Sequence, residues 1–196
     1  MRAKIIATDV DGVMLNWDRS FERWMAIHHN IVRNPEVTSY SCADRYGMDE
    51  DVIWELIEEF NRCDVQGYLP PFRDSLRGVR DLVAAGYRFI AVTSFGGNET
   101  SARWRRNLLR ELFGNVFDEI LILPLCGDKT AALTKLVGVT DYWIEDNLKN
   151  AMTGAVLGFR TYLMDAPYNQ TSEAHPNIVR VASWKEIVAD IVPQVG

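Results

Sequence analysis

Two aspartates end the apolar run in the segment "KIIATDVDGV" near the start of the sequence. Asp9 and Asp11 are separated by a single valine and followed by Gly12. Two carboxylates this close together repel each other and resist burial, unless a positive partner receives them. Carboxylate oxygens are the ligands that a hard cation such as Mg²⁺ takes in proteins. Taken alone, the pattern also fits a turn in which aspartate accepts local hydrogen bonds.

Polar residues of matching chemistry stand at three further places in the chain. They are Thr93 and Ser94 in "IAVTS", Lys129 after "LCGD", and Glu145 and Asp146 in "DYWIED". The acids suit a cation, and the hydroxyls and the lysine suit a phosphate. Each place alone also has an ordinary explanation, as a strand end, a first-turn lysine or a helix cap. Together and in this order they predict a site that binds a cation and a phosphate.

Alternating apolar and helix-period segments predict how these residues are positioned. We expect strands over residues 5–8, 87–94, 119–124, 141–146 and 159–165, and helices over residues 75–85, 99–113, 129–137, 148–157 and 184–191. Glycine follows several of the predicted helices. This alternation predicts a Rossmann-like, three-layer α/β/α fold with a parallel sheet. The carboxyl ends of parallel strands meet at one edge, which would bring the polar residues together.

About sixty residues interrupt the alternation after the first strand. Residues 17–31 and 48–62 have amphipathic helical patterns, and the polar loop between them contains Pro35. We therefore expect a small helical cap over residues 16–74, inserted into a core formed by residues 1–15 and 75–196. A cap inserted at this point suits a lid over the carboxyl edge of the sheet.

Composition limits the classes of partner. The chain has 196 residues and a net charge of −6, from 21 basic and 27 acidic residues, which disfavours binding to polymeric nucleic acid. The basic cluster Arg103, Arg105 and Arg106 is expected to be a solvated helix face.

The chain shows none of the usual signals for secretion or membrane insertion. Its three cysteines have no paired spacing, which indicates a reducing compartment without disulfides or zinc. The first residues lack the basic region and apolar stretch that are typical of a signal peptide, and no apolar run approaches about 20 residues. We expect a cytoplasmic protein without a membrane span.

The four motifs in this order resemble the haloacid dehalogenase (HAD) superfamily of phosphohydrolases. "DVDGV" matches its first motif, Thr93 the second, Lys129 the third and "WIEDN" the fourth. The segments "DVDGVMLNW", "GYLPPFRDSLRGVRDL" and "LMDAPYN" further resemble the 5′(3′)-deoxyribonucleotidase branch, whose members remove phosphate from nucleoside monophosphates. That branch often has Asp-Asp in the fourth motif, where this chain has Glu145-Asp146.

The resemblance implies a Mg²⁺-dependent phosphatase that acts through an aspartyl-phosphate. Asp9 would be the nucleophile, and Asp11 would protonate the leaving group and then activate water. The Asp9 carboxylate, the Asp11 peptide carbonyl and Asp146 would bind Mg²⁺, with Glu145 acting through water. Lys129 would offset negative charge between nucleophile and phosphate.

Four further residues would bind the substrate. Thr93 and Ser94 would donate hydrogen bonds to the phosphoryl oxygens, and Gly12 would let the backbone approach closely. Trp17 would stack on a nucleobase or belong to the core of the cap.

Three other functions compete with the nucleotidase. The first is a HAD phosphatase for another small phosphoester, such as a sugar phosphate. The second is a dehalogenase, in which Asp11 would have no task. The third is a catalytically silent scaffold that binds nucleotides or a partner protein.

Overall fold

A parallel sheet of six strands forms the centre of the molecule, in the order β3-β2-β1-β4-β5-β6. The computed structural model describes residues 4–170 and 175–192. The strands are β1 (Lys4–Thr8), β2 (Tyr87–Ser94), β3 (Phe117–Leu123), β4 (Tyr142–Glu145), β5 (Arg160–Met164) and β6 (Ile178–Val181). Every pairing between neighbouring strands is parallel. The predicted α/β class, with a Rossmann-like parallel sheet, is confirmed.

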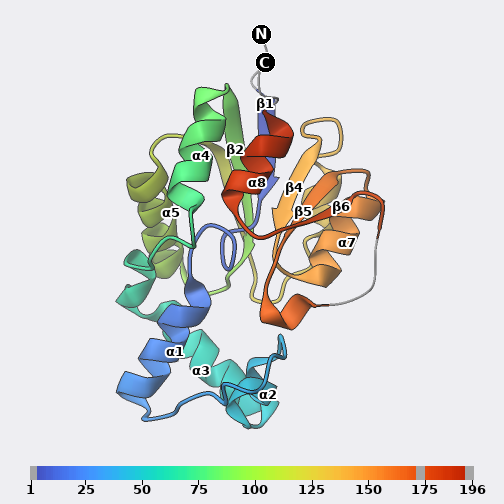
Figure 1. Ribbon diagram of the computed structural model, residues 1–196. Helices are drawn as coiled ribbons and strands as arrows, with labels where there is room; N and C mark the ends of the chain where they lie inside the picture. Colours follow the sequence, from blue (N-terminus) through green and yellow to red (C-terminus); the bar gives the residue numbers. More distant parts are fainter. Residues whose placement is uncertain (1–3, 171–174, 193–196) are drawn as a thin grey trace.

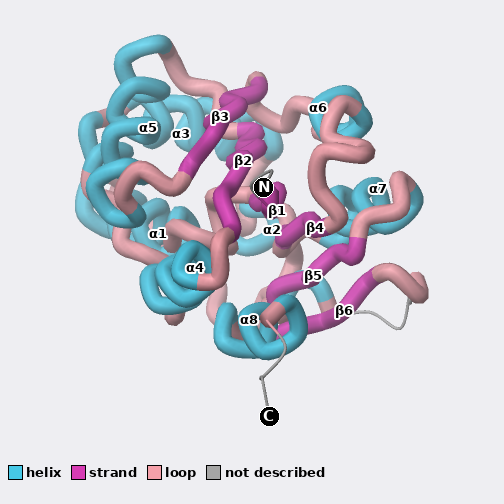
Figure 2. The backbone as a smooth tube through the Cα atoms, turned by 90° about the horizontal axis from the view of Figure 1, so that it is seen from above, coloured by secondary structure: helices cyan, strands magenta, loops and turns pink. Residues whose placement is uncertain are grey.

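Helices cover both faces of the sheet (Figure 1). They are α4 (Ser75–Ala84), α5 (Glu99–Phe113), α6 (Thr130–Thr134), α7 (Leu148–Val156) and α8 (Trp184–Ile191). Figure 2 shows α4, α5 and α8 on one side of the strands and α6 and α7 on the other. This arrangement has the three layers that the sequence predicts.

The central strands are buried on both faces, which explains their continuous apolar runs. Along β1, Ile6 belongs to one buried apolar cluster and Ala7 to another. Along β2, Phe89 belongs to the first of these clusters and Ile90 to the second. Successive side chains of a strand point to opposite faces, so each central strand contributes to both layers of the core.

The inserted segment lies beyond the carboxyl ends of the strands (Figure 1). It contains α1 (Trp17–His28), α2 (Cys42–Tyr46), α3 (Glu50–Arg62) and the 3₁₀ turn η1 (Asp64–Gly67). Among the described residues, no strand of the sheet falls between β1 and α4. Phe21, Trp24 and Phe60 from the insert belong to the same buried cluster as Ile6 of the sheet. The division into a core and a cap domain stays a prediction.

Several short elements differ from the sequence prediction. Helix α6 spans only Thr130–Thr134 instead of residues 129–137, because the chain turns before Gly138, whose φ is +77°. The sequence analysis missed the edge strand β6 and the five-residue helix α2. Elements this short contain only one to two periods of a hydrophobic pattern, and β6 is only partly buried.

No helix in the described part of the chain combines the length and apolar character needed to cross a membrane.

Candidate active site

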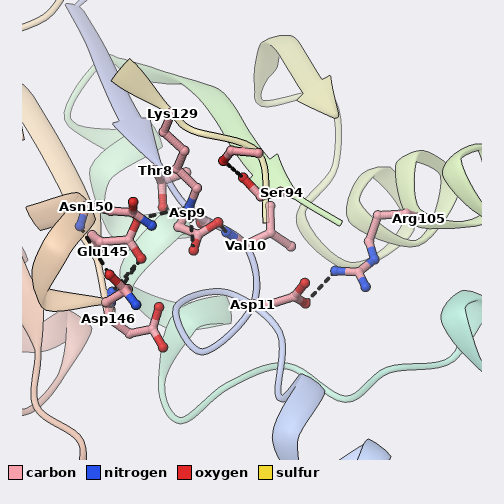
Figure 3. Close-up of polar contacts among 12 residues, drawn as sticks. Thr8, Asp9, Val10, Asp11, Ser94, Arg105, Lys129, Glu145, Asp146 and Asn150 are labelled. Atoms are coloured by element: carbon pink, nitrogen blue, oxygen red, sulfur yellow. Dashed lines mark hydrogen bonds and ion pairs between the residues drawn. The ribbon is translucent and has the colours of Figure 1, made fainter. Parts of the chain in front are cut away.

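Three carboxylates meet at the carboxyl edge of the sheet (Figure 3). Asp9 directly follows β1, and Glu145 and Asp146 stand at the end of the neighbouring strand β4. Each side chain offers an oxygen, and these oxygens all lie within 4.8 Å of one another. All three residues are buried. The parallel register thus joins residues that are separated by more than half of the chain.

Lys129 provides the positive charge of this cluster. It stands at the N-cap of α6, and its Nζ lies 2.8 Å from Asp9 Oδ2 and 2.9 Å from Glu145 Oε2. Burial by itself lowers the pKa of the ammonium, but the carboxylates of Asp9 and Glu145 outweigh burial and raise it. Lys129 therefore stays charged in the site, where it also lies over the ring of Trp143 at 5.3 Å.

Burial and mutual repulsion disfavour the ionised carboxylates. Burial is the main cause that raises the pKa of Asp9 well above its ordinary value, with the charge of Glu145 adding to it and Lys129 opposing it. Burial and then the charge of Asp9 raise the pKa of Asp146 to about 6. With all three carboxylates ionised, the single ammonium would leave two negative charges uncompensated in a buried space. The site therefore favours a further positive group.

The donor set of the cluster fits a divalent cation such as Mg²⁺. Only carboxylate oxygens are offered, which suits a hard cation rather than zinc or copper. Glu145 Oε1 already accepts from the backbone N–H groups of Asp146 at 3.1 Å and Asn147 at 3.0 Å, and Oε2 accepts from Lys129. Glu145 is thus the most occupied of the three, which leaves Asp9 and Asp146 as the freer ligands.

Gly12 allows the chain to pass directly against Asp146. Its φ is +74°, a conformation that residues with a side chain rarely adopt. A Cβ atom at this position would lie 2.7 Å from Asp146 Cγ. The glycine is required here for both its backbone conformation and its lack of a side chain.

Asp11 is not part of the acidic cluster in this structure. Figure 3 shows its carboxylate directed towards Arg105 and away from Asp9. The Arg105 Nη1 donates to Asp11 Oδ1 at 2.5 Å. The prediction that Arg105 belongs to a solvated face is wrong, because its side chain is 0% exposed. Of the other two arginines in this cluster, Arg103 is exposed and Arg106 is half-buried.

The helical period explains the burial of Arg105. Ala102, Leu108 and Leu109 are buried on α5, and Arg105 falls on the same stripe at spacings of three and four residues. This spacing is the signal in the sequence from which the burial could have been predicted.

The two hydroxyl residues end β2, beside β1 in the sheet. Thr93 is buried, and the Ser94 hydroxyl donates to the Gly127 carbonyl at 2.8 Å. This bond ties the end of β2 to the loop that carries Lys129. The predicted contacts of both residues with a phosphate stay predictions.

Tyr168 belongs to the site, but the sequence reasoning assigned it no role. It lies in η2 (Pro167–Asn169) after β5, and its hydroxyl donates to Asp146 Oδ2. Burial and the charge of Asp146 raise the pKa of Tyr168, so the hydroxyl keeps its proton. Asn169 Nδ2 donates to the Asp146 carbonyl at 2.7 Å. The only signal in the sequence is the late segment "LMDAPYN".

Trp17 packs within the inserted helices. Its ring stacks on Phe21 with 4.8 Å between the centroids and meets the edge of Phe60 at 5.4 Å. The indole N–H donates to Asn61 Oδ1 at 2.9 Å. The side chain is half-buried, and its predicted stacking on a substrate stays a prediction.

A pocket in the inserted segment reaches the site through Tyr168. The residues that line it are Asp18, Phe21, Glu22, Arg33, Pro35, Val37, Thr38, Ser39, Arg45, Tyr46, Pro167 and Tyr168. Both arginines of this lining are paired with acids, Arg45 with Asp18 at 3.0 Å and Arg33 with Glu22 at 3.2 Å. The pocket is therefore polar and aromatic but carries no excess of positive charge.

Solved structures share this architecture over nearly the whole chain. A predicted phosphoglycolate phosphatase from Haemophilus somnus has a TM-score of 0.62 at 14% identity, covering 97% of this chain and 99% of that one. The D,D-heptose 1,7-bisphosphate phosphatase of B. bronchiseptica, solved with magnesium and phosphate, has a TM-score of 0.61 at 13% identity, covering 96% and 97%. The fold is that of the haloacid dehalogenase superfamily. The L-2-haloacid dehalogenase of Xanthobacter autotrophicus also shares the HAD fold, with a TM-score of 0.57 at 12% identity and coverage of 98% and 99%.

Sequence comparison adds one relative. An uncharacterised 32.4 kDa protein of Enterobacteria phage T4 is 30% identical over 122 residues, which are 60% of this chain and 44% of the phage protein. The chain thus spans less than half the length of that relative. No family model matches the sequence.

Proposed function

We propose that this protein is a Mg²⁺-dependent phosphomonoester hydrolase that acts through an aspartyl-phosphate on Asp9. The observation that carries the proposal is the contact of Lys129 with both Asp9 and Glu145, inside an acidic cluster at the carboxyl edge of a HAD fold. A buried lysine beside a carboxylate nucleophile offsets charge as a phosphate dianion approaches. The four motifs supply every group that this chemistry needs.

Each residue has a defined task in the proposed reaction. The Asp9 carboxylate forms the bond to phosphorus, while its other oxygen is held by the Val10 N–H at 2.7 Å. Asp11 gives a proton to the departing oxygen and later takes one from the attacking water. Thr93 and Ser94 donate hydrogen bonds to the phosphoryl oxygens, and Gly12 keeps the backbone close.

Asp9, Asp146 and the Asp11 carbonyl would hold the cation, with Glu145 acting through water. When bound, Mg²⁺ neutralises charge on the carboxylates and the phosphate and fixes their relative orientation. Tyr168 orients Asp146 for this task by donating to one of its oxygens.

We propose a nucleoside monophosphate as substrate, with the inserted residues 16–74 acting as a cap over it. The pocket beside Tyr168 combines aromatic rings with arginines whose charge is already paired. Such a lining suits an uncharged, partly aromatic leaving group better than a second phosphate. A sugar monophosphate is the alternative, and the absence of a role for Asp11 speaks against a dehalogenase. We assign the reaction to the cytoplasm, which the three free thiols support.

Phosphate release across a panel of substrates tests the proposal. The panel contains deoxyribo- and ribonucleoside monophosphates, sugar phosphates and a haloacid, each with and without Mg²⁺. We expect Mg²⁺-dependent release that is fastest with nucleoside monophosphates. Preference for a sugar phosphate would make that class the substrate, and release of halide from the haloacid would show that the protein is a dehalogenase instead. Binding of nucleotides without turnover would indicate the silent scaffold.

Trp17 tests the proposed contact of the cap with a base. In Trp17→Ala, the KM for a nucleoside monophosphate is expected to rise more than the KM for a small generic phosphoester. A lost base stack costs about 1–3 kcal/mol by analogy with single-strand binders. Equal changes for both substrates would assign Trp17 to the packing of the cap alone.

A further inference from the structure

Arg105 is a buried cation that the proposed reaction does not use. Its side chain is 0% exposed, although it carries a full positive charge. Burying a charge is costly unless a partner of opposite sign and further hydrogen bonds compensate. The contacts of its guanidinium therefore indicate why this position is occupied by arginine.

Three contacts surround the guanidinium. Nη1 donates to Asp11 Oδ1 at 2.5 Å, and Nη2 donates to the side-chain oxygen of Gln66 at 2.6 Å. The group also lies over the ring of Phe95 at 4.4 Å. Asp11 is the only acid paired with Arg105 among the described residues, and Arg105 Nε has no hydrogen-bond partner there.

These contacts join three parts of the molecule. Asp11 follows β1, Phe95 follows β2, and Gln66 belongs to η1 of the inserted segment. Gln66 is itself 0% exposed, and its amide N–H donates to the Phe60 carbonyl of α3 at 3.0 Å. Asn61 of α3 donates to the Phe95 carbonyl at 3.0 Å. The guanidinium is thus held between the sheet edge and the inserted helices.

We propose that Arg105 is a positioning residue for Asp11, an inference that rests on the proposed phosphatase function. In an in-line displacement, the leaving oxygen lies opposite the attacking Asp9 carboxylate. Figure 3 shows the Asp11 carboxylate on the side away from Asp9, held by Arg105. Arg105 determines where the Asp11 carboxylate stands, and Gln66 links that position to the inserted segment. A displacement of about 1 Å can cost on the order of 10²-fold in rate.

Leaving-group dependence distinguishes positioning from mere support of the fold. An alkoxide from a nucleoside monophosphate needs a proton from Asp11, whereas p-nitrophenolate leaves without one. In Arg105→Gln, we expect kcat for the alkyl ester to fall by roughly 10–10²-fold. The burst of p-nitrophenol should change far less. Arg106→Gln, the same substitution one position along α5, should leave both rates unchanged, because Arg106 pairs with the exposed side chain of Glu99 at 3.6 Å, outside the site.

A second background tests whether Arg105 acts through Asp11. When Arg105→Gln is added to Asp11→Asn, kcat for the alkyl ester should fall little further, because the carboxylate that Arg105 positions is already lost. Arg105→Lys should recover part of the loss in the otherwise unchanged protein. Equal losses on both substrates, or fully additive losses in the double variant, would overturn the proposal. If Arg105→Gln does not fold, Gln66→Met carries the same test, since it removes one anchor and keeps the arginine.

Stability measurements test the pair independently of turnover. A coupling between the two side chains can be measured by urea unfolding of the single variants Asp11→Asn and Arg105→Gln and of the double variant. We expect the effect of the double variant on the unfolding equilibrium constant to be roughly tenfold smaller than the product of the two single effects. If the unchanged protein hydrolyses no phosphoester, the proposed function fails, and the coupling alone then decides whether Arg105 holds Asp11. Additive effects on unfolding would overturn the inference in an active or an inactive protein.

Discussion

Asp9 and Asp11 stand two positions apart, but their side chains have different partners. Asp9 lies against Lys129 and beside Asp146, whereas Asp11 extends to Arg105. Successive odd positions of an ideal strand would point the same way. The chain leaves the strand geometry after Thr8, where β1 ends, so the two carboxylates separate.

This separation predicts different losses for the two carboxylates. Asp9→Asn removes the proposed nucleophile and a metal ligand, so turnover should fall to background with every substrate. Asp11→Asn removes only proton transfer, typically worth roughly 10²–10⁴-fold. The measurement is the burst of p-nitrophenol compared with nucleoside release for both variants. A burst from Asp9→Asn, or its absence from Asp11→Asn with intact Mg²⁺ binding, would reverse the assigned roles.

The backbone conformation of Gly12 and its close approach to Asp146 lead to a second prediction. Gly12→Ala should lower the free energy of unfolding by about 1–2 kcal/mol for the left-handed backbone, and further through the clash with Asp146. Mg²⁺ affinity, measured by calorimetry, should fall because the carboxylate is displaced.

Gly47→Ala is the matched control for this substitution. Gly47 has a φ of +60°, and a Cβ atom there would meet nothing within 4 Å. It should therefore show the backbone cost alone, with unchanged Mg²⁺ affinity. Similar Mg²⁺ affinities for the two variants would contradict the close approach of Gly12 to Asp146.

At the scale of elements, an ion pair connects β5 to the terminal helix α8. Arg160 donates from Nε and Nη2 to the Asp190 carboxylate at 2.6 and 2.8 Å, and the Tyr162 hydroxyl donates to the same group at 2.5 Å. The hydrogen bonds from Arg160 are the main cause that lowers the pKa of Asp190; burial opposes them, and the hydrogen bond from Tyr162 adds to the lowering. The carboxylate is therefore stabilised in the folded protein.

The lowered pKa sets the pH range in which Asp190 contributes to stability. The contribution is complete above the unfolded value of about 3.9 and is lost as the pH falls through the folded pKa. Unfolding of the unchanged protein and of Asp190→Asn, followed with urea from pH 3 to 7, should differ less at acid pH. The side chain is 36% exposed, so the pH-dependent part should be about 1 kcal/mol or less.

Asp81→Asn serves as the control for the Asp190 measurement. Asp81 meets the exposed side chains of Arg77 and Arg80 at 3.6 and 3.7 Å, and such surface pairs contribute little. We expect only a small difference from the unchanged protein. A difference for Asp190→Asn that does not vary with pH would contradict the role of its ionised form.

At the scale of the whole molecule, a buried excess of negative charge lies where the sheet meets the inserted helices. The carboxylates come from the ends of β1 and β4, and Tyr168 reaches Asp146 from the segment after β5. A cation bound there would hold together the ends of β1 and β4 and, through Tyr168, the segment after β5. Its effect should therefore appear in global stability as well as in turnover.

Mg²⁺ is expected to raise the Tm by about 5–10 °C at a hundredfold excess over its Kd. EDTA should abolish both this shift and phosphate release, and Zn²⁺ alone should not restore activity. Asp146→Asn should lose the shift, whereas Asp128→Asn, at an exposed acid beside Lys129, should keep it. Full turnover after exhaustive chelation would exclude the metal from the reaction.

The order of strands and helices, and the strand ends that carry polar residues, could be predicted from the sequence alone. Long apolar runs such as "YRFIAVTS" predict buried strands because a parallel sheet is covered on both faces. The topology rule for parallel strands then predicts that Asp9 and Asp146 share one edge, and the structure brings them together.

The partners of each charged side chain, in contrast, could not be predicted without the three-dimensional packing. Arg105 lies on an apolar helical stripe but carries a charge, so the sequence predicted a solvated face, whereas the structure buries it against Asp11. The hydroxyl of Tyr168 reaches Asp146 from 22 positions away in the chain. Pairing between distant side chains depends on how helices and loops pack in three dimensions. The hydrophobic periodicity of a single segment does not specify that packing.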